Sequence, residues 1–494
     1  MTFVPILLWS VLLLPLTGAA VSLACPSVRA VLWTVRVCVA LTAAVALGCV
    51  WAVHDGLAVE TSWSWLRLDA LSAYHLGVMM LVFMLSSLYL PGYFAAEAKA
   101  GHFPADRARR FGALWFGALA AMALVLLSNN IGIMWVGIEA TTLVTAFLIC
   151  IHRTPASLEA MWKYLIICSV GVAFAFMGTL LAGAAAEHLH LEGARMLLWS
   201  QLRENGARLD PALMKVAFLF LLVGYGTKAG LAPMHSWLPD AHSQAPGPVS
   251  ALFSGFMLNA SLYCIMRYLP LVEAATGRTG WGPRLVLLLG LVSIGVAAVF
   301  ILFQTDLKRL LAYSSVEHMG IVAVGLGLGG PGILAALFHT LNHALCKPLA
   351  FFAAGRLGQM YGTHDMNRLS GCMRTAPVWG RALFGSLLAV IGVAPFAVFM
   401  SEFMVLRAAA RSGAWWTMGV FLLGLGVVFI GVLRRAINMA WGEPAAAGRA
   451  EQAGAADRII IVAALGALLV LGLWFPDALS GMLGQASTIV EGRQ

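Results

Sequence analysis

Eight ionisable side chains fall inside strongly apolar stretches of this sequence. They are Glu139, Lys228, Glu317, His318, His339, His343, Lys347 and Glu402. A charge at the centre of a bilayer costs roughly 2.5–3.5 kcal/mol on insertion scales, so these groups should face a bundle interior or water and have partners. Histidine titrates near physiological pH, and buried lysines and carboxylates exchange protons when burial and neighbouring charges balance. The residue types indicate proton transfer; the alternative for each residue alone is a structural pair or a snorkelling helix end.

Three of these groups share one helical face. His339, His343 and Lys347 are spaced by four residues, which places them on one stripe of an α-helix. Pro348 lacks a backbone donor and so frees a carbonyl one turn earlier, which can hold water. The stripe therefore predicts three proton carriers side by side.

The segment 224–240 places Lys228 beside helix-breaking residues. Gly230 and Pro233 follow it closely, and His235 lies just beyond. Glycine loosens a helix and proline removes a donor, so we expect a helix broken near 230–233. Broken backbone at membrane depth survives only where protein or a wet cavity satisfies its polar groups. The alternative is a kinked helix with a snorkelling lysine.

A similar break is expected later in the chain. The sequence Gly-Leu-Ala-Pro-Met at 230–234 is echoed by Gly-Val-Ala-Pro-Phe at 392–396, with Glu402 just after the second copy. Broken helices at corresponding places in two halves are typical of transporter sites. Pro233 and Pro395 would mark the two breaks.

The composition defines the elements that must position these groups. The chain has 494 residues, of which 61% are hydrophobic and 11% charged, whereas soluble domains carry roughly 25% charged residues. We therefore predict an all-α polytopic membrane protein with about fourteen transmembrane helices of about 20 residues each. The expected spans are 3–24, 30–53, 69–92, 111–128, 131–151, 161–185, 213–232, 247–269, 284–304, 309–328, 332–356, 380–406, 414–440 and 457–475.

These spans predict a single membrane domain over 1–494. Helices 1–3 occupy 1–110, and helix 14 occupies 457–475. Helices 4–8 (111–270) and 9–13 (281–440) form two five-helix repeats, which the odd number of spans inverts. Lysine and arginine favour the odd-numbered loops, so these loops should be cytoplasmic and both termini on the outer side.

Several other functions find no support in the residues. The formal charge of +9 is spread over loops, without a basic, aromatic-rich patch for nucleic acid. The eight cysteines form no Cys-x-x-Cys pair, and we predict neither a cofactor nor a metal. His235 and His242 flank Asp240, but Pro239 and the loop setting favour a gate or loop contact over a metal site.

Five short segments together resemble one family. They are Trp135-Val136-Gly137-Ile138-Glu139, the run from Lys228 through Trp237-Leu238-Pro239-Asp240 to Pro248, the run from Leu310 to Gly320, His343-Ala344-Leu345-Cys346-Lys347, and Ser401-Glu402-Phe403. This set resembles the antiporter-like subunits of respiratory complex I, of multi-subunit cation/proton antiporters and of energy-converting group 4 membrane hydrogenases. The resemblance covers roughly helices 4 to 12.

The resemblance implies roles for individual residues along a hydrated mid-membrane axis. Glu139 is similar to the helix 5 glutamate that pairs with a helix 7 lysine, here Lys228. Lys347 is similar to the central helix 11 base, and Glu402 to the terminal acid of helix 12. Asn259 stands where many relatives have a helix 8 lysine, and an amide holds water but carries no proton as a base. The link onward would then use water, His339 or His343.

The expected function follows from this resemblance. We expect a proton-translocating subunit without redox chemistry of its own, most similar to the formate hydrogenlyase type, in the plasma membrane of a prokaryote. Its partners would be other membrane subunits and a peripheral arm that oxidises hydrogen, formate or NADH. The alternatives are a sodium/proton antiporter module, a structural anchor with a vestigial axis and an enzyme acting on quinone.

Overall fold

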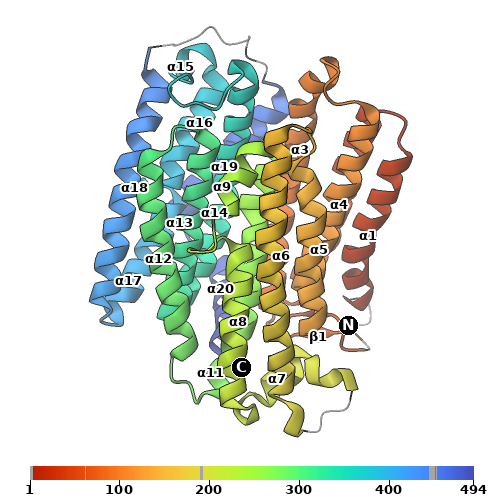
Figure 1. Cartoon of the computed structure of the whole chain (residues 1–494), viewed down its shortest axis with the longest axis vertical. Coiled ribbons are helices and arrows are strands. Elements are labelled where there is room, and N and C mark those ends of the chain that lie inside the picture. The colour runs from red at the N-terminus through yellow and green to blue at the C-terminus, as the bar shows by residue number, and fades with distance from the viewer. Residues whose placement is uncertain (1–3, 62, 190–192, 444–450, 452, 494) are drawn as a thin grey trace.

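The computed structural model describes residues 4–61, 63–189, 193–443, 451 and 453–493, and nearly all of its regular structure is helical (Figure 1). The first half contains α1 (Val4–Ala24), α2 (Val28–Ala52), the strands β1 (Val59–Glu60) and β2 (Arg67–Leu68), α3 (Ala70–Lys99), α4 (Ala105–Leu127), α5 (Ile131–Ile149), α6 (Pro155–Ala184), α7 (Trp199–Glu204), α8 (Pro211–Ala229) and α9 (Trp237–Gln244). The second half contains α10 (Gly247–Leu252), α11 (Leu258–Ala275), α12 (Trp281–Phe303), α13 (Leu307–Leu328), α14 (Pro331–Tyr361), α15 (Cys372–Thr375), α16 (Pro377–Val390), α17 (Ala397–Arg411), α18 (Trp415–Trp441), α19 (Ala455–Leu473) and α20 (Asp477–Glu491).

Twelve of the described helices are long and apolar enough to cross a membrane. The 31-residue α14 and the interrupted pair α16–α17 are not among these twelve, and they occupy the eleventh and twelfth expected spans. The prediction of an all-α polytopic membrane protein is confirmed. The division into two inverted repeats stays a prediction.

Both expected helix breaks are present. Helix α8 ends at Ala229, and Gly230 follows with a left-handed φ of +76°. Helix α16 ends at Val390, and Gly392 has a φ of +67° before α17 begins. Glycine is the default residue in this conformation because it has no Cβ. The chain therefore crosses both regions as non-helical backbone, with Pro233 and Pro395 inside them.

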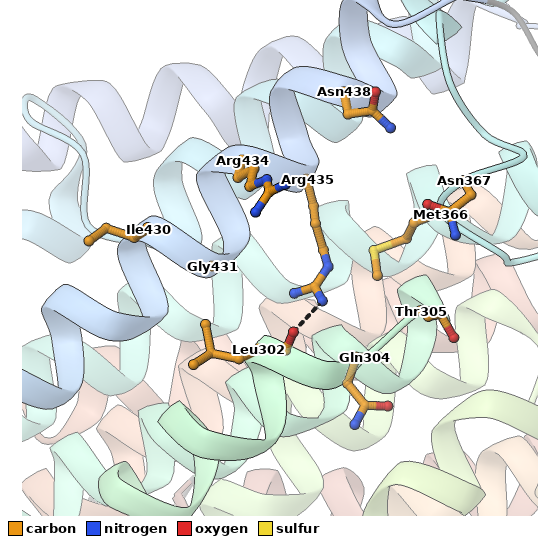
Figure 2. A pocket seen from close by; sticks show the side chains of 10 residues that line it. All are labelled: Leu302, Gln304, Thr305, Met366, Asn367, Ile430, Gly431, Arg434, Arg435 and Asn438. Carbon is orange, nitrogen blue, oxygen red and sulfur yellow. Dashed lines mark hydrogen bonds between the residues drawn. The ribbon is translucent and has the colours of Figure 1, made fainter.

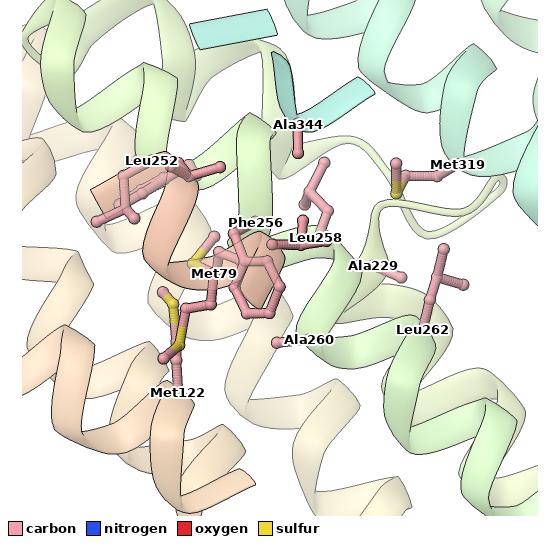
Figure 3. Packing of buried hydrophobic residues seen from close by; sticks show 14 of the residues in the cluster. Met79, Met122, Ala229, Leu252, Phe256, Leu258, Ala260, Leu262, Met319 and Ala344 are labelled. Atoms are coloured by element: carbon pink, nitrogen blue, oxygen red, sulfur yellow. The ribbon is translucent and has the colours of Figure 1, made fainter. Parts of the chain in front are cut away.

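The centre of the bundle is formed by α10, α11, α13 and α14. In its most apolar window, the segment Gly247–Ala275 is completely buried, whereas α1 and α18 are each only one-third buried there. Figure 3 shows Met79 of α3 and Met122 of α4 packed against Phe256 of this central segment. Most of the ionisable groups lie on these central helices, so they are surrounded by protein.

Small residues bring α6 and α8 close together. A Cβ on Gly224 would lie 2.5 Å from the Gly171 carbonyl oxygen and 2.6 Å from the Ala175 Cβ. Such small-residue contacts let membrane helices approach backbone to backbone. The approach sets Lys228, one turn after Gly224, against α6.

Two features were not expected from the sequence. The central segment contains one turn of π-helix, Phe253–Met257, directly before Asn259. Helix α20 packs against α3, α11 and α14 through an apolar face that includes Leu483, Ala486 and Ile489. It lies beyond the last predicted span and was missed because it is too short to cross a bilayer.

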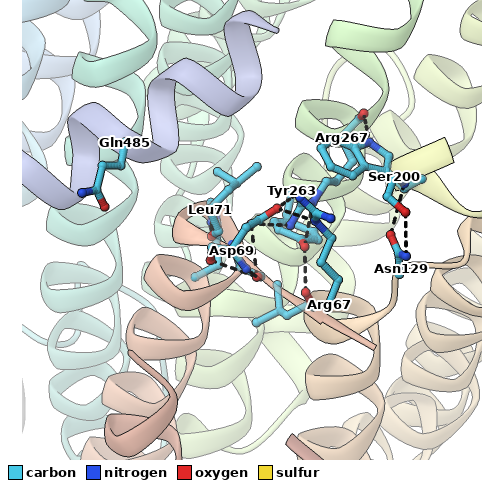
Figure 4. Close-up of polar contacts among 12 residues, drawn as sticks. Arg67, Asp69, Leu71, Asn129, Ser200, Tyr263, Arg267 and Gln485 are labelled. Atoms are coloured by element: carbon cyan, nitrogen blue, oxygen red, sulfur yellow. Dashed lines mark hydrogen bonds and ion pairs between the residues drawn. The ribbon is translucent and has the colours of Figure 1, made fainter. Parts of the chain in front are cut away.

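A buried ion pair joins α3 to α11 at the end of the bundle that carries β1 and β2 (Figure 4). Asp69 caps α3 by accepting from the Ser72 backbone N–H. Its two carboxylate oxygens accept from Arg267 at 2.7 and 2.8 Å. The Arg267 guanidinium also lies over the rings of Trp199 and Tyr263. This cluster fixes the start of α3 against α11.

Candidate functional site

Lys228 is completely buried and surrounded by hydroxyl groups. Its Nζ donates to the Thr142 Oγ1 of α5 at 2.9 Å and to the Tyr164 hydroxyl of α6, and it lies 4.5 Å from the centre of the Tyr164 ring. The Tyr164 hydroxyl also forms a hydrogen bond with the Thr145 Oγ1, at 2.6 Å. A connected set of hydroxyls thus surrounds one amine.

The expected pairing of Lys228 with Glu139 is not a direct ion pair in this structure, and it stays a prediction. No ion pair joins the two, although both belong to the described part of the chain. Glu139 is half-buried, accepts from the Ser169 hydroxyl at 3.4 Å and leaves its Oε2 without a partner. The reason is position along α5: Thr142 lies about one turn beyond Glu139 on the same face and takes the ammonium.

Lys347 repeats this arrangement on α14. It is completely buried, and its Nζ donates to the Ser314 Oγ at 2.5 Å and to the Leu311 carbonyl at 3.0 Å, both on α13. Glu317 lies three residues after Ser314, is buried, and its Oε2 has no partner. Each lysine therefore meets a hydroxyl that stands three residues from a glutamate.

A chain of hydrogen bonds runs from α13 through α14 to α17. The His318 Nδ1 lies 2.8 Å from the His339 Nε2, and the His339 Nδ1 lies 2.9 Å from the Ser401 Oγ. Asn342 also donates to Ser401, at 3.2 Å. The ring of His343 is tilted against that of His318, with 5.1 Å between the ring centres, and neither of its ring nitrogens has a partner. The predicted stripe on α14 thus faces polar groups of two other helices.

Buried polar atoms also lie between the two lysines. Asn259 donates to the Gly255 carbonyl at 3.0 Å, and its Oδ1 has no partner. Ser254 and Ser315 join the π-helical turn to α13 at 2.7 Å. His242 stacks on Phe351, with both ring nitrogens unpartnered. Since nearly all buried polar groups bind protein or ordered water, these atoms indicate positions for water.

Glu402 stands at the far end of the chain of groups. It is buried on α17, directly after Ser401. It lies against Gly392, where a Cβ would collide with its carboxylate. Glu402 also borders a cavity of about 260 Å³ lined by Phe399, Phe403 and other residues of α17 and α18. This carboxyl group therefore has an opening toward the side of the bundle.

His235 lies apart from these groups. It is largely buried and contacts the rings of Phe300 and Tyr313. Asp240 forms ion pairs with Arg309 at 2.5 Å and Lys163 at 3.2 Å. Both carboxylate oxygens of Asp240 are therefore already used. The expected loop setting is wrong, because Asp240 and His242 lie on helix α9.

The hydroxyl partners of the buried lysines and of His339 were not predicted from the sequence. Thr142, Tyr164, Ser314 and Ser401 are ordinary residues in membrane helices, where they commonly bond to their own backbone. Two had a usable signal, because Thr142 and Ser314 stand three residues from Glu139 and Glu317, on the same helical face. Tyr164 and Ser401 had no such signal, because neither stands three residues from a glutamate on its own helix.

Comparison with known proteins connects this arrangement to one family. Residues 128–428 match the family model described as "NADH:quinone oxidoreductase/Mrp antiporter, TM". The chain is 41% identical over 361 residues to a hydrogenase-4 component F homolog of Methylacidiphilum infernorum, covering 73% of this chain and 75% of that protein. It is 33% identical over 349 residues to hydrogenase-4 component B of Escherichia coli, covering 68% of this chain and 50% of that protein.

The fold is shared with a solved structure over almost the whole chain. A subunit of the membrane-bound sulfane sulfur reductase, an archaeal respiratory membrane complex, superposes with a TM-score of 0.87 and covers 99% of this chain and 98% of its own. The sequence identity is 22%, so this likeness concerns the fold.

Proposed function

This chain belongs to the NADH:quinone oxidoreductase/Mrp antiporter transmembrane family, and from that premise we propose that it is a proton-translocating, antiporter-like subunit of a redox-driven membrane complex. The observation that carries the proposal is a pair of completely buried lysines whose ammonium groups donate to hydroxyl and carbonyl oxygens of neighbouring helices. Ionisable groups at membrane depth mark ion paths and proton relays.

The proposed path begins at Glu139 and passes through Ser169 and the hydroxyls around Lys228. Water held by Asn259, Ser254 and His242 would connect Lys228 with Lys347. The hydrogen bonds of His318, His339 and Ser401 would then lead to Glu402. A buried lysine and a histidine can each release and rebind a proton, and hydroxyl groups both donate and accept hydrogen bonds, as a relay needs.

The broken helices support the proposed placement of this path. Backbone left without helical partners at membrane depth is tolerated where it lines a polar cavity. We assign helices 4–8 and 9–13, residues 111–270 and 281–440, to two inverted repeats that place one break on each side. The interrupted pairs α8–α9 and α16–α17 would be the corresponding elements.

The relatives favour a hydrogenase-type complex. The two hydrogenase-4 components are similar over more than two-thirds of this chain. We propose other membrane subunits and a peripheral redox arm as partners, since the matched respiratory structure is also a multi-component membrane complex. We further propose a prokaryotic plasma membrane, with both termini on the outer side. The redox chemistry would belong to the arm.

A sodium/proton antiporter module is the second candidate. The family itself includes the Mrp antiporters, which favours this reading. Replacing sodium by choline during the transport assay separates the two functions. Proton translocation by a redox-driven subunit should persist without sodium, whereas proton movement by a sodium/proton exchanger should stop.

Substitution of Lys347 by methionine tests the proposed function. The change removes the ammonium group and keeps an apolar stem of similar length. We expect an assembled complex that still oxidises its donor and no longer acidifies the outside, as measured by protons per electron in proteoliposomes. Lys215→Met is the matched control, because Lys215 is an exposed lysine of α8. A Lys347→Met complex with the wild-type ratio would refute the proposal.

A further inference from the structure

A basic pocket, shown in Figure 2, lies where α12 and α18 approach their C-terminal ends, and neither Lys228 nor Lys347 lines it. It has a volume of about 570 Å³ and opens between the last turn of α12, the final third of α18 and Met366–Asn367. Arg434 and Arg435 line it together with Gln304 and Asn438, and no carboxylate is among its described lining residues. The pocket therefore presents two positive charges without internal neutralisation.

One of the two arginines is fixed in place and the other is not engaged. The Arg435 guanidinium donates to the carbonyls of Ile301 and Leu302, both at 2.6 Å. These carbonyls belong to the last turn of α12, where carbonyl oxygens have no backbone N–H donor within the α-helix. Arg435 thus uses two of its five donors and keeps the others for a ligand. Arg434 is exposed and makes no hydrogen bond or ion pair with any residue that the structure describes.

The surface beside the pocket is apolar. Phe303 at the end of α12 is 76% exposed, and Ile430, one turn before Arg434, is 68% exposed. Trp441 ends α18 and is 55% exposed. Tryptophan gathers at the boundary between hydrocarbon and water, so Trp441 indicates that the arginines lie at headgroup level. A ligand with an anionic head and apolar chains fits both surfaces.

A second basic pocket lies at the same end of the bundle. It has a volume of about 550 Å³ and lies between the end of α1, the start of α4 and the end of α5. Its charged lining residues are Arg107, Arg110, Arg153 and one acid, Asp106. Figure 1 shows α1 and α18 on opposite sides of the molecule. Two basic pockets at one end of the bundle and on opposite sides of it face the same leaflet of a bilayer.

We propose that the pocket formed by Arg434 and Arg435 binds the phosphate headgroup of an anionic phospholipid, whose acyl chains lie along Phe303 and Ile430. Arginine binds phosphate through several charge-assisted hydrogen bonds. Basic pockets between membrane helices on the cytoplasmic side are suited to anionic headgroups. This site is independent of the proposed proton path.

Lipid retention by the purified full chain tests this site. The chain in neutral detergent is incubated with phosphatidylglycerol or with phosphatidylcholine of the same acyl chains, and bound lipid is counted by native mass spectrometry. We expect preferential retention of phosphatidylglycerol and a loss of about fivefold in Arg434→Gln, since one arginine near an anionic surface contributes about that factor. Arg434→Gln leaves the α12 contacts of Arg435 in place. Arg411→Gln is the control, because Arg411 is exposed at the end of α17 and lies outside the pocket.

A second variant and a competition arm distinguish the sources of the anion. Asn438→Glu adds a negative charge to the pocket and should weaken retention as much as Arg434→Gln. Inorganic phosphate at millimolar concentration should not displace the lipid. Equal retention of both lipids by the wild type, equal retention by Arg434→Gln and Arg411→Gln, or displacement by phosphate alone would each overturn the proposal.

Discussion

The imidazoles of His318 and His339 meet nitrogen to nitrogen across two helices, with 2.8 Å between Nδ1 of the first and Nε2 of the second. One of these nitrogens must donate and the other accept, so the two rings cannot both be charged in this contact. The other nitrogen of His339 faces the Ser401 hydroxyl at 2.9 Å. If a proton passes along this chain of hydrogen bonds, the donor and the acceptor of each bond must exchange roles.

Removal of the Ser401 hydroxyl should interrupt that line. Ser401→Ala leaves the His339 Nδ1 without its partner, and we expect proton translocation to fall about tenfold, the order of one lost buried hydrogen bond. Donor oxidation should continue. Ser386→Ala is the control, because the Ser386 hydroxyl is buried and bonds to the carbonyl of Leu383 in its own helix. Equal proton-to-electron ratios in the two variants would contradict a role for Ser401.

Glu139 should matter although it makes no ion pair with Lys228. Glu139→Gln removes the only carboxylate on the α5 face that leads to Thr142. We expect the complex to assemble and to lose proton translocation, measured in proteoliposomes against donor oxidation. Normal coupling in an assembled Glu139→Gln complex would show that the path does not begin there.

Tyr164 gives a separate test of the contacts at Lys228. Tyr164→Phe keeps the ring beneath the ammonium and removes the hydroxyl that joins Lys228 to Thr145. We expect translocation to fall about tenfold, again the order of one hydrogen bond. Tyr361→Phe removes a hydroxyl whose one hydrogen bond to a described residue, Thr375, lies outside the path, and it should leave the proton-to-electron ratio unchanged. A Tyr164→Phe complex as efficient as this control would rule out the hydroxyl.

The main elements could be predicted from the sequence because membrane helices have a strong signal in length and apolarity. The breaks near Gly230 and Gly392 were predictable for a local reason, since glycine and proline act on the backbone where they stand. The partners of the lysines were not, because they depend on which helices touch. Close packing of Gly224 on Gly171 brings Tyr164 to Lys228. The sequence pattern within α8 does not predict this contact, because it carries no information about the neighbouring helix.

The ion pair of Asp69 and Arg267 should be essential for stability. Asp69→Asn leaves Arg267 buried without its counter-charge, which costs about 3–5 kcal/mol. We expect a clearly lower thermal unfolding midpoint for the purified chain in detergent. Asp55→Asn is the control, because Asp55 is exposed. Equal midpoints for the two variants would show that water replaces the lost partner.

The same pair makes a prediction about pH. Burial by itself would raise the pKa of the Asp69 carboxyl, but Arg267 and the other donors hold that pKa below its ordinary value. A depressed pKa adds stability that is present above the ordinary value of about 3.9 and is lost as the pH falls toward the folded-state pKa. Between pH 8 and 5 the wild-type advantage over Asp69→Asn should therefore be constant.

Reporter fusions test the number of crossings. A reporter inserted at Gly448 and one attached after Gln494, both outside the described residues, are separated by the single predicted helix 457–475. Helix α20 is too short to cross. The two fusions should label opposite sides of the membrane, with the Gln494 fusion outside. Labelling on the same side would overturn the fourteen-helix arrangement.

The hydroxyl surroundings of the two lysines limit which cation could follow this axis. Within the described structure, neither Lys228 nor Lys347 contacts a carboxylate in an ion pair. A hard metal ion takes several oxygen ligands, which carboxylates, carbonyls or water can supply. A lysine nitrogen is tethered to its helix and cannot leave to make room for such an ion. The covalent attachment of these two amines therefore suits the axis to passing protons, and a sodium ion would need a route beside them.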